Sequence, residues 1–541
     1  RDASRFDNQH ETSSFHSSVH CVGETHDPTT AWKHRSCNYV NLCVDLGGDS
    51  KQDAKPEIFL VSSESEERFK DSFGKAAVHG QYPYSSTEIL GSGSNNYRSD
   101  NHSDGAATGQ YSPLDVALGG INPSWRAPPT PRVPYEIGID KIRWTPKVYN
   151  KMPFEKYYEL DPNVVLVPYH SFAAANVGHL LWDDFLPIYN LLRIFGYDQS
   201  NNPHNRFEQD EINNGYQHLL LRVNTMPVMF GSCDLRARKR EECKKNFERF
   251  LPLFGVNPDT FSTLTEAKLT KDIVTKEVLS KDSQKAPQSY PICAKHAVAG
   301  LGWLTDHGIR NHGWMINHEE NSLDVALAHN VGRGPELYSF RNFMLQNIGF
   351  ETFSVASRSS QHQKVSFRVL LSAHTSKHLD RKFGLEVQQK ALAKAFPNAE
   401  VSVLDLVGMP LMDQISLVSN QPSIQNKDEE RQLRNPGSPM RQRQHTIFIS
   451  ACGGGSATAY FLPKGSSLIL YYNEVGGMDY FDNEKNTGGQ AMLDWDLMNN
   501  LGYLKVHWLP IGSMNEQGGL DALVSLVQHE MNAVLDGLVF G

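Results

Sequence analysis

The chain has 541 residues, of which 39% are hydrophobic, and a formal net charge of −9 at pH 7. This length exceeds what one hydrophobic core supports, so we expect two domains with extensions. The acidic balance argues against nucleic acid and anionic membrane surfaces as main partners, because binding to phosphates requires a basic surface.

The N-terminal region is rich in cysteine and in loop-forming residues. Cys21, Cys37 and Cys43 are clustered there, which is typical of disulfides in an oxidising compartment. We predict a cysteine-containing extension over residues 1–134 with a flexible loop inside it. Farther along, Cys233 and Cys243 can bridge locally, and free buried thiols are the alternative for the whole set. The seven cysteines have an odd count and no C-x-x-C spacing, so they do not indicate zinc: Cys21, Cys37, Cys43, Cys233, Cys243, Cys293 and Cys452.

The sequence contains no run of 18 or more apolar residues, so we expect no segment of it to cross a bilayer. It begins at Arg1 rather than at Met. We therefore expect the chain to be the luminal part of a longer protein whose signal or anchor lies upstream.

Strands and helices are mixed between residues 135 and 330. Apolar runs predict buried strands at Val164–Pro168 and His218–Val223, and a further buried segment at Cys293–Leu304. Within that segment, Gly300 and Gly302 allow close approach of a neighbouring backbone.

A polar cluster follows the first of these strands. If the segment is helical, His179 and Asp183 stand four residues apart on one face, and Asn176 lies one turn earlier. Pro187 cannot donate to the carbonyl of Asp183, so we expect a kink or restart there. With Asp184, this cluster suits acid–base chemistry in which a carboxylate orients the imidazole. A capped core helix whose His bonds its own carboxylate is the alternative. The restarted helix is predicted to bury Ile188, Leu191, Leu192 and Phe195.

Strands and helices alternate regularly beyond residue 330, which is the pattern of a parallel, doubly wound sheet. Ligands of such sheets bind at the carboxyl ends of the strands. The final segment, 516–541, contains an amphipathic helix at Asp521–Val539 that we expect to pack across the two domains. The predicted strands are Phe367–Ser372, Val401–Leu406, Thr446–Ser450 and Ser467–Tyr472, and the predicted helices are Lys382–Phe396, Leu411–Ser419 and a short one ending at Leu462.

A triple-glycine turn lies in the stretch I-S-A-C-G-G-G-S-A-T-A-Y-F-L-P-K-G, Ile449–Gly465. Glycines between a strand and a helix let a ligand approach the backbone, and the helix start favours a diphosphate. Ser456 and Thr458 can add hydroxyl donors. A purely structural turn is the alternative. Thr458 departs from the dinucleotide fingerprint and no acidic residue follows at the required distance, which disfavours a nucleotide-dependent oxidoreductase.

Two stretches resemble glycosyltransferase family 61: N-x-G-H-x(3)-D-D-x-L-P at Asn176–Pro187, and the glycine turn followed by F-L-P-x-G. That family includes plant β-1,2-xylosyltransferases, an EGF-domain O-GlcNAc transferase and an O-mannose β-1,4-N-acetylglucosaminyltransferase. The segment Trp32–Cys43 also looks like the family's cysteine segment. The resemblance implies a GT-B-like α/β fold with two Rossmann-like lobes and a cleft between them, residues 135–330 on the acceptor side and 331–515 on the nucleotide-sugar side.

The resemblance also implies an activity. It is inverting, metal-independent transfer of GlcNAc or xylose from a UDP-sugar to a glycan or glycoprotein acceptor in the Golgi or endoplasmic reticulum, without a cofactor. It implies a catalytic set and a substrate-binding set. The catalytic set is His179, Asp183 and Asp184, and the substrate-binding set is Asn176, His374, Lys377, Cys452, Gly453, Gly454, Gly455, Ser456, Thr458 and Lys464.

The chain departs from the family pattern at the donor side. Cys452 stands where the family has His, and Lys464 replaces a Pro. In the upstream S-R-x(3)-R pattern, Ala373 and Lys377 replace the two arginines, and Lys supplies only a point charge where Arg makes a bidentate clamp. Either Lys377, His374 and Lys464 take over, or the protein is a catalytically degenerate carbohydrate- or nucleotide-sugar-binding relative.

Two rival metal patterns are weaker. Asp494-Trp495-Asp496 forms the D-x-D motif of the other major glycosyltransferase fold, but it lies in a segment predicted to be helical rather than at a strand end. His307 and His312 lack a third ligand nearby. Neither pattern predicts a metal site.

Overall fold

The structure, a computed structural model, describes part of the chain between residues 15 and 537. The described residues are 15–22, 35–45, 57–62, 114–118, 143–155, 157–169, 177–198, 216–222, 242, 245–246, 248–255, 291–300, 334–350, 365–373, 384–406, 409–420, 444–452, 456–472, 498 and 500–537. The chain divides into two compact units. The first comprises residues 1–175, 179–201 and 208–305, and the second comprises residues 176–178, 202–207 and 306–541.

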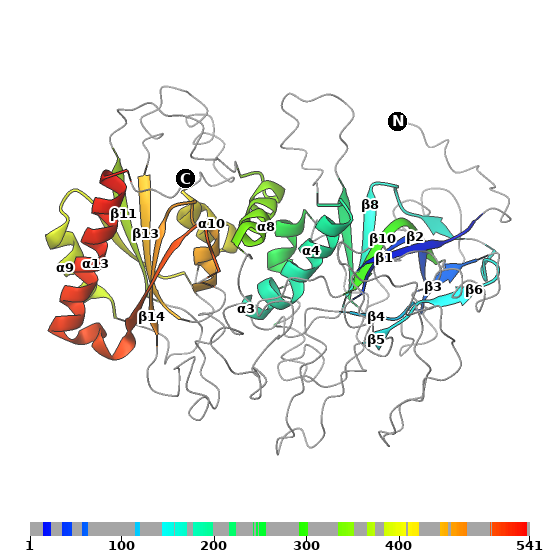
Figure 1. The fold of residues 1–541 in the computed structure, drawn as a ribbon, viewed down its shortest axis with the longest axis horizontal. Helices are drawn as coiled ribbons and strands as arrows, with labels where there is room; N and C mark the ends of the chain where they lie inside the picture. The colour runs from blue at the N-terminus through cyan, green and yellow to red at the C-terminus, as the bar shows by residue number, and fades with distance from the viewer. Residues whose placement is uncertain are drawn as a thin grey trace, which may run out of the picture. The chain divides into compact units, whose positions relative to one another are not determined.

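The first unit is built on an eight-stranded mixed sheet (Figure 1). The strand order is β6-β3-β2-β10-β8-β9, with β1 paired to β2 and β7 paired to β10. A separate two-stranded sheet pairs β4 with β5. The strands are β1 (Ser18–Val22), β2 (Ser36–Asp45), β3 (Glu57–Val61), β4 (Val116–Ala117), β5 (Arg143–Trp144), β6 (Lys147–Tyr149), β7 (Tyr158–Glu159), β8 (Val164–Tyr169), β9 (Gln217–Arg222) and β10 (Ile292–Gly300).

The strands predicted in this unit are present. β8 lies between β10 and β9 and runs parallel to both. Its run of apolar residues suits a strand covered on both faces. Gly300 has φ +139°, and a Cβ there would lie 2.7 Å from the carbonyl oxygen of Arg35, so the predicted close backbone approach is confirmed. Gly302 is outside the described residues.

The boundary predicted at residue 134 does not separate two sheets. β2 pairs along most of its length with β10, and both pairs that β2 makes with its outer neighbours β1 and β3 are antiparallel. The N-terminal strands therefore belong to the same sheet as the strands after residue 135. This sheet is mixed rather than a parallel Rossmann sheet. β2 is antiparallel to β1, β3 and β10, whereas the pairs β10–β8, β8–β9, β10–β7 and β3–β6 are parallel.

Two disulfides join antiparallel neighbours in this sheet. Cys21–Cys37 links β1 to β2, and Cys43–Cys293 links β2 to β10, in each case between directly paired residues. The prediction of disulfides in the N-terminal region is confirmed. Cys452 is not part of a disulfide, and Cys233 and Cys243 lie outside the described residues.

The two cysteines on either side of Asn41 in β2 pack in different core clusters. Cys37 and Cys43 are an even number of residues apart, so a regular strand would point both to one face. Instead Cys37 packs in one core cluster and Cys43 packs in another, with Phe59 and Cys293. Between them Asn41 adopts φ +59°, a left-handed conformation that Asn tolerates better than most residues.

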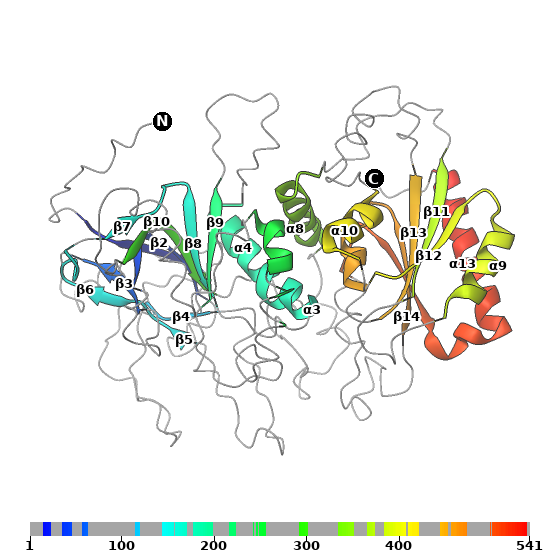
Figure 2. The ribbon, with the colours of Figure 1, turned by 180° about the vertical axis from the view of Figure 1, so that it is seen from behind.

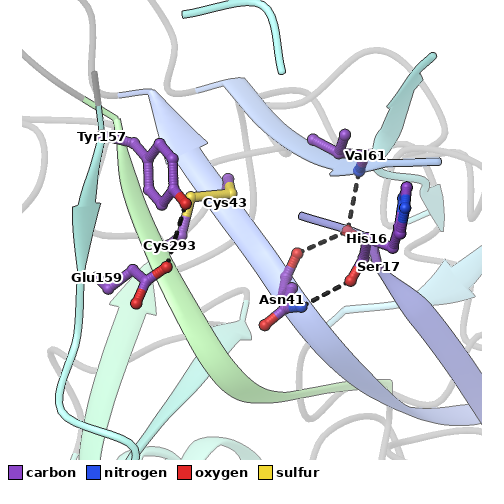
Figure 3. Close-up of a disulfide and its surroundings, with 8 residues drawn as sticks. All are labelled: His16, Ser17, Asn41, Cys43, Val61, Tyr157, Glu159 and Cys293. Atoms are coloured by element: carbon purple, nitrogen blue, oxygen red, sulfur yellow. Dashed lines mark hydrogen bonds between the residues drawn. A yellow bond between two sulfur atoms is a disulfide. The ribbon is translucent and has the colours of Figure 1, made fainter. Parts of the chain in front are cut away.

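Local hydrogen bonds hold Asn41 in that conformation (Figure 3). The hydroxyl of Ser17 donates to the carbonyl of Asn41 at 2.7 Å, and Nδ2 of Asn41 donates to the carbonyl of His16 at 2.6 Å. The amide of Ser17 donates to the carbonyl of Val61 at 2.7 Å. This point is where β2 changes its outer partner from β1 to β3.

The second unit contains a five-stranded parallel sheet in the order β12-β11-β13-β14-β15. Taken in chain order this is 2-1-3-4-5, a common doubly wound arrangement, and the prediction of such a sheet is confirmed. The elements are α8 (Gly334–Asn347), β11 (Ser366–Ser372), α9 (Glu386–Ala395), β12 (Glu400–Leu404), α10 (Leu411–Ser419), β13 (Gln444–Ala451), the 3₁₀ helices η11 (Ser456–Phe461) and η12 (Ile511–Asn515), β14 (Ser467–Tyr472), β15 (Lys505–Pro510) and α13 (Gln517–Leu535).

Helices cover both faces of this sheet. α9 and α13 lie on one face and α10 on the other, as both views show (Figures 1 and 2). Alternate strand residues, such as Val369, Ile447 and Ile469, pack with Leu392 and Val527 of the first two helices. The C-terminal helix was expected to pack across two domains; three of its buried residues, Leu523, Val527 and Met531, belong to the core of this one sheet.

Candidate functional site

The polar cluster after β8 lies on a helix with three parts. α3 (Val177–His179) leads into a π-helix, η4 (Leu180–Phe185), and then into α4 (Leu186–Ile194). The predicted restart at Pro187 is present: the proline falls in the first turn of α4, where its missing N–H is not needed. The wider π turn absorbs the change of hydrogen-bond register ahead of it. Single π turns inside helices are frequent at functional sites.

The support beneath the cluster is apolar, as predicted. Residues 186–192 of α4 are all buried, including Ile188, Leu191 and Leu192, and α4 packs against β10. Phe195, just after the helix, is half-buried and lies edge-on to the ring of His20 at 6.4 Å.

The structure places two of the three predicted catalytic residues only by backbone. His179 ends α3 and Asp183 lies in η4, and their side chains are outside the described part of the chain. Asp184, also in η4, is buried with 1% of its surface exposed. Asn176 is outside the described residues. The helical placement of His179 and the aspartates is therefore established, and their mutual side-chain geometry stays a prediction.

The second candidate region is the carboxyl edge of the five-stranded sheet. The chain goes from β11 outward to β12, and then crosses back to β13 on the other side of β11. The carboxyl ends of β11 and β13 are therefore neighbours at a topological switch point, the place where open α/β sheets bind ligands. Ser372 ends β11 and pairs directly with Ser450, one residue before the end of β13.

Cys452 follows β13 at this edge. The residue is half-buried and not disulfide-bonded, and its backbone N–H donates to the carbonyl of Tyr471 on β14 at 2.9 Å. Beside it, Ala373 N–H donates to the carbonyl of Leu404 at 3.0 Å. Gly453, Gly454 and Gly455, like His374 and Lys377 after β11, lie outside the described residues.

η11 carries two further predicted contacts. Ser456 begins the helix and Thr458 is its third residue, and both side chains are buried, with 0% and 6% of their surface exposed. The short helix predicted to end at Leu462 ends at Phe461 and has the tighter 3₁₀ form.

Lys464 is not at the same edge as Cys452. It lies three residues before β14, at the amino end of that strand, because η11 runs back along the sheet from the end of β13 to the start of β14. There its Nζ lies 5.8 Å from the centre of the Tyr338 ring. Lys464 and Cys452 therefore lie at opposite ends of the β13–β14 pair.

Sequence reasoning missed the residues that hold the C-terminal end of η11. Phe461 and Tyr460 end this helix, and their carbonyls accept hydrogen bonds from Nη2 of Arg341 at 3.0 Å and from the hydroxyl of Tyr503 at 2.6 Å. Arg341 belongs to α8, which was not predicted. A Gly-Pro-Glu start at Gly334 was the available signal, because proline favours the first helical turn.

A buried ionic cluster lies at the amino edge of the same sheet. Glu530 of α13, 2% exposed, accepts hydrogen bonds from Ser467 at 2.5 Å and from Nε2 of His507 at 3.0 Å, and Nζ of Lys505 lies 3.5 Å away. Burial raises the pKa of Glu530, but the hydrogen bonds from His507 and Ser467 and the charge of Lys505 outweigh it and lower the pKa to about 2. This cluster joins a helix to two strands, away from the switch point.

The described ranges hold no arrangement typical of a metal centre or a membrane span. No group of three or more His, Cys, Asp or Glu side chains there is placed to hold a metal ion. Asp494, Asp496, His307 and His312 are not among these residues. Within the same ranges, no helix has both the length and the apolar character needed to cross a bilayer.

Comparison with known proteins adds no relative: no protein-family model matches the chain, and no curated protein matches it.

Proposed function

We propose that the protein is an inverting, metal-independent glycosyltransferase that moves GlcNAc or xylose from a UDP-sugar to a glycan or glycoprotein acceptor. The observation that carries the proposal is the position of Cys452, the residue that precedes the three glycines in the sequence. The sequence after Cys452 leaves β13 at the switch point of a 2-1-3-4-5 parallel sheet. Nucleotides bind at this position in doubly wound sheets, and glycines there let phosphate approach the backbone.

The resemblance to glycosyltransferase family 61 supports the same function from the sequence. Direct displacement with inversion needs a base for the acceptor hydroxyl and stabilisation of the departing diphosphate. We assign the base to the pair His179 and Asp183, with Asp184 beside them on η4. The π turn that carries the two aspartates supports a functional role for this helix.

The donor side is assigned to fewer residues than the sequence suggested. Cys452, the three glycines, His374 and Lys377 follow the carboxyl ends of β13 and β11, so they keep their proposed roles. Lys464 loses its role as a phosphate ligand because it lies at the amino end of β14. The buried hydroxyls of Ser456 and Thr458 support a role in shaping the turn more than a direct contact.

The two disulfides are evidence about the compartment in which the protein folds. Two buried disulfides in one sheet are typical of proteins that fold in an oxidising lumen or outside the cell. We propose the Golgi or endoplasmic reticulum lumen as the site of action, in keeping with a glycoprotein acceptor.

The test is turnover of a panel of nucleotide sugars, each with and without EDTA. Release of UDP from UDP-GlcNAc or UDP-xylose that survives EDTA supports the proposal. Absence of turnover with every donor, or its complete loss in EDTA, argues against it.

A second candidate function is a degenerate relative that binds a sugar or nucleotide sugar without transferring it. It is favoured by Cys452 and Ala373, which stand where the resembling family has His and Arg. Calorimetry with UDP separates the two, because an intact donor site binds UDP even when transfer is lost. UDP binding without turnover, together with a gain of turnover in Cys452→His, identifies the degenerate relative.

A further inference from the structure

A buried histidine connects the ends of two helical segments in the first unit. His218 of β9 is 5% exposed. Its Nε2 lies 2.8 Å from the carbonyl oxygen of Tyr197, and its Nδ1 lies 3.2 Å from the carbonyl oxygen of Phe254. Tyr197 follows α4, and Phe254 is the last residue of the 3₁₀ helix η6 (Leu251–Phe254). Both ring nitrogens therefore face acceptors, and these come from two separate parts of the chain.

The first of these carbonyls belongs to the C-terminal cap of α4. The amide of Tyr197 donates to the carbonyl of Leu192 at 2.7 Å, and the amide of Gly196 donates to that of Arg193 at 3.1 Å. Gly196 has φ +76°. These are the two hydrogen bonds and the left-handed glycine of a Schellman motif. A hydrogen bond from Nε2 to Tyr197 therefore attaches β9 to a well-defined helix end.

The second carbonyl belongs to a residue that packs against the π turn. The ring centre of Phe254 lies 4.5 Å from that of Phe185, the last residue of η4, and both side chains are completely buried. Asp184 precedes Phe185 and is buried as well. The contacts of His218 consequently reach the helix from both sides, at the end of α4 and, through Phe254, at the end of η4.

The charge of the ring decides how well it fits this position. A neutral imidazole carries one N–H, so it can donate to one of the two carbonyls, and the shorter distance favours the carbonyl of Tyr197. The imidazolium could donate to both, but a charge buried away from water loses several kcal/mol of hydration, roughly, in a protein interior. Two neutral acceptors have to offset that loss.

The groups around the ring show which effect is larger. Val165 of β8, which pairs with His218, is apolar, and η6 presents the carbonyl of Phe254. The segment after α4 presents the carbonyl of Tyr197 and the charge of the half-buried Asp198. Burial lowers the pKa of His218, and both carbonyls and Asp198 oppose the change only in part. The neutral ring is therefore the form that fits the folded protein at pH 7.

We propose that His218 is an acid-sensitive link: the neutral ring holds the junction between the ends of α4 and η6, and acidification favours an opened junction in which the ring is hydrated and charged. Opening removes the support of the π turn that carries Asp184. This inference does not rest on the proposed function, because it concerns the support of η4 and α4 and involves no ligand.

The direction of the pH effect follows from linkage. The pKa of His218 in the folded protein lies below the usual value of 6.5, which the ring regains when it meets water. The contribution of the neutral ring is therefore complete above pH 6.5 and is lost as the pH falls below it. Because opening takes up one proton, the opening constant should rise by up to about tenfold for each pH unit in that range.

His296 of β10 provides a matched control. Its Nδ1 lies 3.1 Å from the hydroxyl of Tyr197, so it contacts the same residue as His218. Burial, followed by the charge of Lys295, lowers its pKa as well. A hydroxyl can donate or accept, so neutral and charged forms of this ring both keep a hydrogen bond to Tyr197. Replacement of His296 should therefore leave the acid response of the junction unchanged.

The experiment is hydrogen exchange of the full chain, followed by mass spectrometry from pH 7.5 down to the onset of acid unfolding. Peptides covering η4, the end of α4 and η6 are compared in the wild type, His218→Gln and His296→Gln, with the intrinsic effect of pH on exchange removed. Gln stays neutral and can still donate one hydrogen bond to Tyr197. A peptide from α10, in the second unit, is the internal reference.

We expect the protection of these peptides to fall below pH 6.5 in the wild type and in His296→Gln, by up to about tenfold per pH unit. In His218→Gln it should stay level over the same range. His218→Asn, also neutral and able to donate, replaces His218→Gln if that variant does not fold. If neither folds, the wild type and His296→Gln decide by the presence or absence of the slope.

Each result decides the proposal. A slope in the wild type that His296→Gln keeps and His218→Gln loses supports the acid-sensitive link. A flat wild-type profile down to acid unfolding overturns it. An equal slope in His218→Gln also overturns it, because another group then carries the response.

Discussion

Nε2 of His507 donates a hydrogen bond to the carboxylate of Glu530 over 3.0 Å, and so ties β15 to the C-terminal helix α13. The same carboxylate accepts the hydroxyl of Ser467 at the start of β14. A single buried charge thus connects the helix to two neighbouring strands.

This relationship predicts an acid limit on the stability of the second unit. The folded pKa of Glu530 is about 2, below its model-compound value of 4.5, so its contribution is present above pH 4.5 and is lost as the pH falls from about 4.5 to about 2. We expect Glu530→Gln to lower the free energy of unfolding at pH 7 by about 3 kcal/mol. The urea midpoint of the variant should also change less than that of the wild type between pH 5 and pH 2.5.

The exposed Glu386 on α9 provides the control for this measurement. Glu386→Gln should follow the wild-type pH dependence. Equal pH slopes for wild type and Glu530→Gln would contradict the prediction.

Asn41 gives a second prediction, on the first unit. Replacement by Ala keeps neither the tolerance for φ +59° nor the hydrogen bond to the carbonyl of His16, and should cost about 1–2 kcal/mol. Asn41→Gly keeps the backbone conformation and loses only the side-chain bond, so it should cost less. Urea unfolding ranks the two variants, and an Ala variant as stable as the Gly variant would show that the left-handed backbone carries no strain.

The two disulfides should differ in their contribution to stability. Cys43–Cys293 closes a loop with a sequence separation of 250, and Cys21–Cys37 one with a separation of 16. In the chain-entropy model, closing the longer loop stabilises the folded protein by about 5 kcal/mol, and closing the shorter loop stabilises it by about 3 kcal/mol. The double variant Cys43→Ser/Cys293→Ser should therefore unfold at lower urea than Cys21→Ser/Cys37→Ser. The reverse order would mean that the loop-closure term does not dominate.

The proposed catalytic helix yields a kinetic prediction. His179→Ala should lower the rate of transfer by about 10²–10⁴, the usual contribution of a general base, and leave the Kd for UDP unchanged. Asp183→Asn should show a smaller loss if the carboxylate orients the imidazole. His529→Ala, on the exposed face of α13, is the control. Unchanged turnover in His179→Ala would show that His179 is not the general base.

Local sequence patterns predicted the second unit well. The bounds of α10 and β14 agree with the expected ranges Leu411–Ser419 and Ser467–Tyr472, because each apolar run there corresponds to one buried element. α8 was missed, since its apolar residues alternate with charged and polar ones and do not form a clear stripe.

Long-range pairing limited the prediction of the first unit. Nothing in the sequence near Cys43 indicates that its partner is Cys293, or that β2 lies beside β10. Strand order depends on contacts between segments that are distant in the chain, which local periodicity does not encode.

The candidate site was predictable in part. The alternation of strands and helices placed Cys452 at the carboxyl end of a parallel strand, and the structure has it there. Lys464 comes just before a parallel strand. A residue in that position is expected at the amino-end edge of the sheet, opposite to Cys452, and the structure has Lys464 there. The support of η11 by Arg341 was beyond local patterns, because the two segments are 120 residues apart.

The bond between Cys43 and Cys293 has a consequence for biosynthesis. A ribosome adds about 5–20 residues per second, so β2 emerges roughly 10–50 s before β10, the strand that carries its cysteine partner. During that interval the Cys43 thiol is exposed next to Cys21 and Cys37, and any of the three can oxidise with the wrong neighbour. The yield of correctly paired protein should consequently depend on a thiol–disulfide isomerase that keeps Cys43 available until β10 has been translated.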